Sequence, residues 1–271
     1  MDSPVLFAFM VTLFAGLATG IGSLMALLSK RFNPKFLALS LGFSAGVMIY
    51  VAFVEIFVKA REALTESYLN QEIFGMDKAY LYTVISFFVG IGIIALIDKF
   101  VPSAENPHEI KSLENPEKMK DKRLMRLGVF SALAIGIHNF PEGMATFMAA
   151  MQDPALGISI AFAIAIHNIP EGIAVSIPVY FATKNRKKAF TLSFLSGLAE
   201  PIGAIIGYML LSTILDQSVF GYVFAAVAGI MIYISLDELL PTAEEYGEHH
   251  IAIWGLIAGM LTMALSLVLF S

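Results

Sequence analysis

The stretch GVMIYVAFVE at residues 46–55 recurs as GIMIYISLDE at residues 229–238, with Gly, Met, Ile, Tyr and the final Glu at matching places. A second pair of blocks, GLATGIG at 16–22 and GLAEPIG at 197–203, keeps the same order and nearly the same separation. Chance similarity between Gly- and Ile-rich helices is the alternative explanation, and the shared order argues against it. The beginning of the chain therefore resembles its end.

The composition is that of an integral membrane protein. Its 271 residues are 58% hydrophobic and only 14% charged, whereas a soluble domain is about 25% charged. A helix needs about 20 apolar residues to cross the hydrocarbon core of a bilayer, and the apolar runs are that long. We expect an all-α integral membrane protein with a single transmembrane domain over residues 1–271. The eight expected helices cover residues 4–29, 34–58, 78–100, 124–151, 154–182, 186–213, 217–240 and 250–270.

The distribution of positive charge predicts the orientation of these helices. If the spans alternate in direction, three clusters of Lys and Arg lie on one side: residues 30–35, 99–126 and 184–188. Only Lys59, Arg61 and Lys78 fall on the other side. Because short cytoplasmic loops carry the excess of positive charge, we expect a cytoplasmic loop at about 101–123. Both termini are then expected outside the cytoplasm, with the protein in the cell membrane.

The repeat and the helix count together predict an inverted repeat. Helices 1–3 match helices 6–8, and an offset of five spans turns the copies in opposite directions through the membrane. Inverted repeats place a transporter's substrate site near the bilayer midplane, where the copies meet.

Helices 4 and 5 carry a second duplication, HNFPEG at 138–143 and HNIPEG at 167–172. His138 lies about 14 residues, and His167 about 13 residues, from opposite membrane faces, which is about 20 Å at 1.5 Å per residue. The two motifs are therefore expected to meet at mid-membrane. Ionisable residues at that depth are costly unless they face a cavity, a partner or an ion.

The spacing within each motif suits a metal ion. His138 and Glu142 are four residues apart and share a helix face, and Asn139 is turned about 100° from them. His167, Asn168 and Glu171 repeat the pattern. Mixed nitrogen and oxygen donors bind Zn²⁺, Fe²⁺, Mn²⁺ or Co²⁺ without selecting sharply among them.

Glu200 is expected at the same depth in helix 6, as an additional ligand. Its counterpart in the first copy of the repeat is Thr19, so the symmetry breaks at this position. A single buried His is more often a hydrogen-bonded core residue than a ligand. Two motifs at matched depth, together with Glu200, favour a metal site.

Other polar and sulfur-bearing residues have two interpretations. Met48 and Met231 are either core packing or ligands. Glu55, Asp237 and Glu238 near helix ends are either solvated charges or carboxylates at the entrance (Glu55) and exit (Asp237, Glu238) of a pathway. His249 and His250, with Glu244, Glu245 and Glu248, either form a solvated loop, which is the simpler interpretation, or capture metal on the cytoplasmic side. His108 stands alone in a loop and indicates no role.

The doubled HNxPEG motif, GLAE before Pro201 and SLDELLP at 235–241 resemble the Zrt-, Irt-like (ZIP) metal transporter family over nearly the whole chain. The resemblance implies a 3+2+3 arrangement of eight helices, uptake into the cytoplasm and a binuclear site. It implies one metal position formed by His138, Glu142, His167 and Glu171, which Met48 lines. It implies a second position at which Asn139, Asn168 and Glu200 join the two glutamates.

These observations favour a divalent metal importer that works by alternating access and is not an enzyme. The expected cargo is zinc, with iron, manganese, cobalt or cadmium also carried. We expect no prosthetic group. We expect the protein to form a homodimer. The absence of cysteine excludes thiolate sites, and because the chain has no basic arm, no nucleic-acid partner is expected. An intramembrane metal-dependent hydrolase and a non-transporting metal sensor are the alternatives, and the absence of an HExxH motif disfavours the first.

Overall fold

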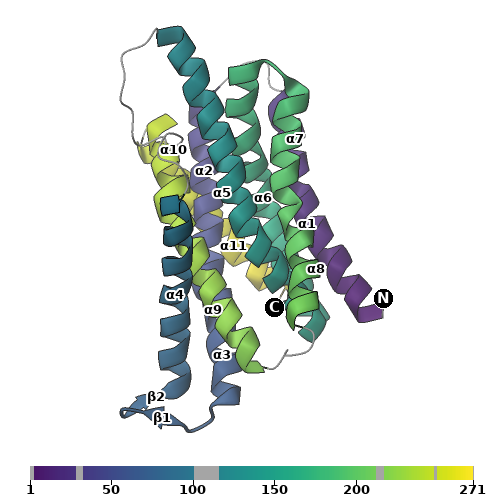
Figure 1. The fold of residues 1–271 in the computed structure, drawn as a ribbon, viewed down its shortest axis with the longest axis vertical. Helices are drawn as coiled ribbons and strands as arrows, with labels where there is room; N and C mark the ends of the chain where they lie inside the picture. The colour runs from purple at the N-terminus through teal and green to yellow at the C-terminus, as the bar shows by residue number, and fades with distance from the viewer. Residues whose placement is uncertain (1–2, 29–32, 101–115, 212–216, 247–248, 271) are drawn as a thin grey trace.

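The protein is a bundle of long helices with one small hairpin (Figure 1). The computed structural model describes residues 3–28, 33–100, 116–211, 217–246 and 249–270. Its α-helices are α1 (Ser3–Leu28), α2 (Pro34–Val51), α3 (Phe57–Ser67), α4 (Lys78–Phe100), α5 (Pro116–Gln152), α6 (Pro154–Thr183), α7 (Arg186–Gly197), α8 (Ala199–Leu211), α9 (Gln217–Ile234), α10 (Leu240–Tyr246) and α11 (His249–Phe270). Two π-helical turns, η1 (Ala52–Ile56) and η2 (Ser235–Leu239), interrupt α2–α3 and α9–α10.

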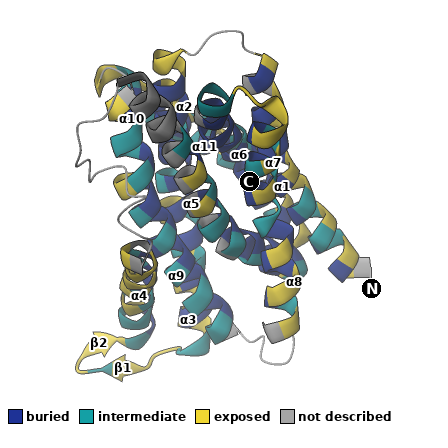
Figure 2. Cartoon of the chain, turned by 45° about the horizontal axis from the view of Figure 1, so that its top comes forward, coloured by how far each residue is buried: buried dark blue, intermediate teal, exposed yellow. Residues whose placement is uncertain are grey.

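Seven helical segments in the described part of the chain are long and apolar enough to cross a membrane. They are α1, α2–η1–α3, α4, α6, α7–α8, α9–η2–α10 and α11. Large apolar side chains lie exposed on their outer faces, among them Phe88 on α4 and Leu261 on α11 (Figure 2). The chain is therefore a multi-pass membrane protein. The predicted fourth helix lies within α5, which is not among the seven, so the count of eight and the 3+2+3 arrangement stay predictions.

Three helices begin at residues that satisfy free backbone N–H groups. The side chain of Asn33 accepts a hydrogen bond from Phe36 N (3.2 Å), and that of Asp153 accepts one from Ala155 N (2.8 Å). The side chain of Asn185 accepts one from Lys188 N at the start of α7. Pro34 and Pro154 follow two of these caps, at a position where a missing N–H costs nothing. The predicted starts at 34, 154 and 186 are confirmed for this reason.

Four helices differ from the prediction. The helix predicted for 124–151 begins at Pro116, so residues 116–123 of the predicted loop are helical. The helix predicted for 34–58 continues through η1 to Ser67, and the one predicted for 217–240 continues through η2 to Tyr246. The helix predicted for 186–213 breaks at Leu198, between α7 and α8. Pro201 explains the break, because it has no N–H to donate to the carbonyl of Gly197.

A short antiparallel hairpin was not predicted. Strands β1 (Glu72–Ile73) and β2 (Met76–Asp77) lie between α3 and α4. Phe74 and Gly75 at its turn have φ of 54° and 72°, which is the left-handed conformation that such tight turns require.

The helices pack as two groups. The first bundle consists of α1, α5, α6, α7 and α8; the second bundle consists of α2, α3, α4, α9, α10 and α11. The bundles meet chiefly where α2 packs against α6 and α5 against α9.

The repeat is visible as matched contacts in the second bundle. A Cβ on Gly46 would overlap the carbonyl of Leu256 on α11, and a Cβ on the matching Gly229 would overlap the carbonyl of Phe87 on α4. The turns η1 and η2 also occupy matching places in the repeat. In Figure 1, α2–α3 runs down to the hairpin whereas α9–α10 runs up, so the two copies point in opposite directions.

Candidate metal site

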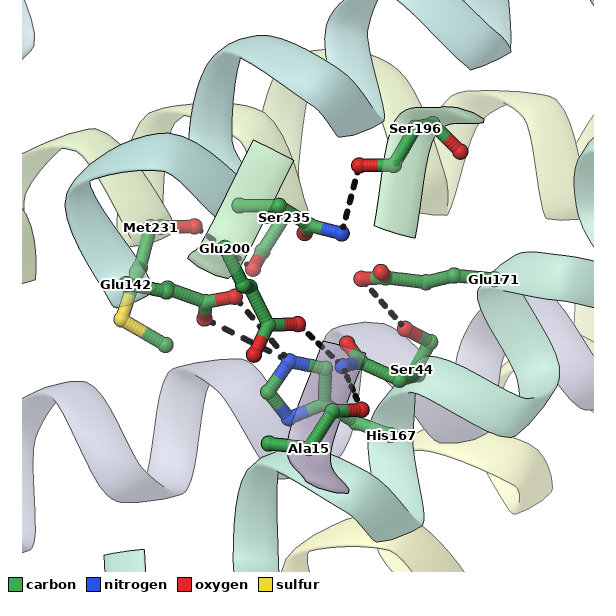
Figure 3. Close-up of polar contacts among 11 residues, drawn as sticks. Ala15, Ser44, Glu142, His167, Glu171, Ser196, Glu200, Met231 and Ser235 are labelled. Atoms are coloured by element: carbon green, nitrogen blue, oxygen red, sulfur yellow. Dashed lines mark hydrogen bonds and ion pairs between the residues drawn. The ribbon is translucent and has the colours of Figure 1, made fainter. Parts of the chain in front are cut away.

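The candidate site lies inside the first bundle, where α5 and α6 face each other and α8 approaches α5 (Figure 3). Six of the predicted ligands are fully buried there: Asn139, Glu142, His167, Asn168, Glu171 and Glu200. Glycine permits the close approach, because a Cβ on Gly143 would overlap the backbone of Glu200. The sequence therefore brings a carboxylate of α8 next to the motif of α5.

The two motifs contact each other through an imidazole and a carboxylate. Nε2 of His167 on α6 lies 3.3 Å from Oε1 and 3.4 Å from Oε2 of Glu142 on α5. Figure 3 shows the ring pointing at this carboxylate. The predicted convergence of the motifs is thus confirmed for this pair.

The two asparagines make matched contacts through their amide nitrogens. Asn168 donates to the carbonyl of Ala15 on α1 (2.8 Å), and Asn139 donates to the carbonyl of Ser196 on α7 (3.4 Å). Ala15 and Ser196 occupy equivalent places directly before GLATGIG and GLAEPIG. Asn168 also donates to Oε1 of Glu200. Both amide oxygens therefore remain free to face the interior of the site.

Several buried oxygens, including the hydroxyls of Thr19, Thr146 and Ser266, have no hydrogen-bond partner among the described residues. Three others are Asn139 Oδ1, Asn168 Oδ1 and Glu200 Oε2. Each unpaired buried polar group costs about 1–3 kcal/mol, and native proteins rarely leave such groups unpaired. These are the three residues expected at the second metal position. A divalent cation would satisfy all three, so the donor set fits such an ion.

Ser44 is a site residue that the sequence analysis missed. Its Oγ donates to Oε1 of Glu171 (3.4 Å), which links α2 of the second bundle to α6 of the first. Ser44 precedes Met48 by one helical turn, and both are fully buried. The sequence feature that could have identified Ser44 is its position one helical turn before Met48, a candidate ligand.

The described side chains do not form a complete metal-binding group, and the predicted methionine ligands lie in the apolar core. Among the described side chains, no group of three or more His, Asp or Glu residues is already arranged to hold a metal ion. His138 lies in α5, but its side chain is outside the described residues. Met48 belongs to the main apolar core, as its packing interpretation predicts, and so does Met231.

The predicted pathway carboxylates lie on the two π-helical turns. Glu55 is half-buried on η1; on η2, Asp237 is exposed and Glu238 is half-buried. Glu238 also lines a small cavity between the bundles. The other residues around this cavity are Leu41, Ile135, Ala174, Ile234, Leu239 and Thr242. The cavity begins about one turn from Ser44 and Glu171, at the end of the bundle where Glu238 lies.

His249 and His250 lie outside the candidate site. His249 Nδ1 lies 2.7 Å from Glu244 Oε1, and both side chains are exposed. His250 is exposed beside it. His108 and most of the predicted loop at 101–123 lie outside the described residues.

Comparison with known proteins identifies the relatives of this chain. The model of the family described as "ZIP Zinc transporter" matches residues 98–267. A "Zinc transporter ZupT" from Chlorobaculum parvum is 65% identical over the whole of both chains. Proteins of the same name from Lysinibacillus sphaericus and Streptococcus mutans are 60% and 59% identical, over 99% and 100% of each chain respectively. These relatives are transporters and not enzymes, as the sequence analysis expects of this chain.

Proposed function

The chain belongs to the ZIP family of zinc transporters, and from this premise we propose that it imports zinc through a midplane site in the first bundle. The observation that carries the proposal is the buried set of imidazole, carboxylate and amide groups in which His167 meets Glu142 and Asn168 meets Glu200. The cell membrane is its proposed location.

The site holds two metal ions. The first position uses His138, Glu142, His167 and Glu171, with Met48 beside it. The second uses the oxygens of Asn139, Asn168 and Glu200 together with the same two glutamates. The three unpartnered oxygens support the second position, and the contact between His167 and Glu142 supports the first.

The donor set accepts metals other than zinc. Imidazole nitrogens and carboxylate oxygens bind several divalent ions and leave the choice to geometry and availability. Iron, manganese, cobalt and cadmium are therefore further cargo. Direct competition for zinc uptake tests each of them.

Transport proceeds by alternating access of the two bundles. The motif helices α5 and α6 pack with α1, α7 and α8, so the moving unit is larger than the central helix pair alone. Metal enters near Glu55 on η1 and leaves past Glu238 and Asp237 on η2. The cavity beside Glu238 supports an exit at this end, and the charge distribution makes it the cytoplasmic end. Both termini then lie outside the cytoplasm, and a homodimer is a further part of the proposal.

Uptake of radioactive zinc into proteoliposomes tests the proposed function. The variant His167→Ala with Glu171→Ala removes an imidazole and a carboxylate from the site, and uptake is expected to fall to the level of protein-free vesicles. The control, His249→Ala with Glu244→Ala, removes the same two residue types from an exposed pair and should transport like the parent. Undiminished uptake by the first variant would disprove the site.

The same experiment separates transport from the two alternatives. A metal sensor would bind zinc at the site without moving it into sealed vesicles. A hydrolase would cleave lipid or peptide in a zinc-dependent way. Zinc accumulation that requires the site residues excludes the first alternative, and the transporter family disfavours the second.

A further inference from the structure

Thr19 on α1 is a fully buried threonine whose hydroxyl has no hydrogen-bond partner among the described residues. Buried Ser and Thr side chains in helices usually bond to the carbonyl four residues earlier. Thr12 does so on the same helix, to Ala8 O at 2.9 Å, and Thr83 does so on α4, to Ala79 O at 2.8 Å. Thr146 on α5 and Ser266 on α11 also lack a partner among the described residues, so the position of Thr19 beside the candidate site, and not its free hydroxyl alone, sets it apart.

The carbonyl that Thr19 would ordinarily use is occupied by the candidate site. This carbonyl belongs to Ala15, and it accepts the amide of Asn168 at 2.8 Å. The hydroxyl of Thr19 points elsewhere. A Cβ built on Gly197 would lie 2.8 Å from Thr19 Oγ1, so the hydroxyl occupies space that the glycine leaves open.

Thr19 is bounded by residues adjacent to site residues on two helices. Gly197 follows Ser196, whose carbonyl accepts the amide of Asn139. Gly172 follows Glu171, and a Cβ on Gly172 would overlap the carbonyl of Thr19. The hydroxyl therefore lies against Gly197, next in the chain to the residue whose carbonyl accepts the amide of Asn139.

The repeat gives this position a specific meaning, because Thr19 is the counterpart of Glu200. Asn168 reaches Ala15 and Glu200, and Asn139 reaches Ser196, the counterpart of Ala15. Because Asn168 also contacts Glu200, the equivalent neighbour of Asn139 under the repeat is Thr19. Asn139 Oδ1 and Thr19 Oγ1 are both buried without a partner in the described part of the protein.

We propose that Thr19 is a further ligand-supplying residue of the metal site, whose hydroxyl supplies a neutral oxygen to the coordination shell of a divalent cation on the Asn139 side. It takes the place that the charged Glu200 takes on the Asn168 side. The site then holds three buried carboxylates, those of Glu142, Glu171 and Glu200, rather than four. One fewer negative charge weakens retention of the cation, which suits a site that must release its cargo. This inference rests on the proposed function.

The test compares zinc binding and thermal stability of purified full-length protein. Thr19→Val replaces the hydroxyl by a methyl group of similar size, Thr19→Ala removes it without adding bulk, and Thr19→Ser retains it. Thr12→Val is the matched control, since it removes a buried hydroxyl of the same helix that is already bonded within the helix.

Zinc affinity is expected to fall about tenfold in Thr19→Val and in Thr19→Ala, as expected for the loss of one polar contact to a charged partner. Affinity should be retained in Thr19→Ser and in Thr12→Val. Without zinc, Thr19→Val should melt no lower than the parent, because the lost hydroxyl has no partner to lose. The shift in melting temperature caused by zinc should shrink.

Two results would overturn the proposal: parental zinc affinity in both Thr19→Val and Thr19→Ala, or a lower melting temperature without zinc at unchanged affinity, which indicates a structural role. Glu200→Gln, measured in parallel, separates this inference from the proposed function. If Glu200→Gln loses zinc and the Thr19 variants do not, only the role of Thr19 is disproved. If Glu200→Gln also binds like the parent, the proposed second metal position fails as well.

Discussion

Each bundle contains helices from both copies of the repeat, but the two bundles bury different kinds of polar side chain. Among the described residues, every buried acid, imidazole and amide belongs to the first bundle. In its described part, the second bundle buries only hydroxyl-bearing polar side chains, such as Ser44 and Thr83, within an apolar core. Since unpaired polar groups at membrane depth are costly, this concentration supports the proposal that the metal binds in the first bundle.

Glycine contacts allow the close packing of both bundles. Gly143 contacts the backbone of Glu200 in the first bundle, and Gly46 contacts that of Leu256 in the second. Small residues at helix interfaces let backbones approach in lipid. The bundles therefore differ in chemistry and not in the way their helices pack.

The largest effect is expected from filling such a contact in the first bundle. Gly143→Val places two methyl groups against the backbone of α8 and should destabilise the protein by about 3 kcal/mol or more. Gly92→Ala is the control, because a Cβ at Gly92 meets nothing within 4 Å. Melting temperature and yield of folded protein in detergent measure the difference. Equal stability of the two variants would contradict the packing described.

A smaller effect is expected from removing one charge of the site. Glu200→Gln keeps the size of the side chain but removes a carboxylate whose Oε2 has no partner in the described structure. Zinc affinity should fall roughly 10- to 100-fold, the range for losing an interaction with a charged group. Calorimetric titration measures it. Glu62→Gln, at an exposed position of α3 where Glu62 pairs with Lys59, should leave affinity unchanged.

The smallest effect is expected where the two bundles touch. Ser44→Ala removes the hydrogen bond to Glu171 across the interface. Zinc should then bind up to about fivefold more tightly, since Glu171 no longer has to release a bond worth about 1 kcal/mol. Weaker zinc binding would instead make Ser44 a ligand. Ser40→Ala, one turn earlier on α2, is the control.

The sequence predicted the membrane class, the main helix starts and the meeting of the two motifs. Their duplication, with prolines and caps at fixed places, specifies those features locally. Helix partners could not be predicted, because apolar helices offer many equivalent faces and the choice depends on fits such as Gly46 against Leu256. The turns η1 and η2 add one residue to a helical turn without changing composition, so their sequence does not reveal them.

The candidate site shows the same limit. HNxPEG and GLAE predicted from depth and spacing that Glu142, His167 and Glu200 belong to a metal site, and the structure shows all three buried. Ser44 and Thr19 remained unrecognised because a hydroxyl in an apolar helix normally bonds to its own backbone. Thr19 is distinguished by the carbonyl of Ala15, which accepts the amide of Asn168. Ser44 is distinguished by its hydrogen bond to Glu171.

Anomalous X-ray diffraction at the zinc absorption edge, from crystals grown with zinc, locates the bound metal without ambiguity. Zinc is expected inside the first bundle, bounded by Glu142, His167, Glu171 and Glu200. Zinc found only at surface positions such as His249 and Glu244, in a protein that still transports zinc, would disprove this site.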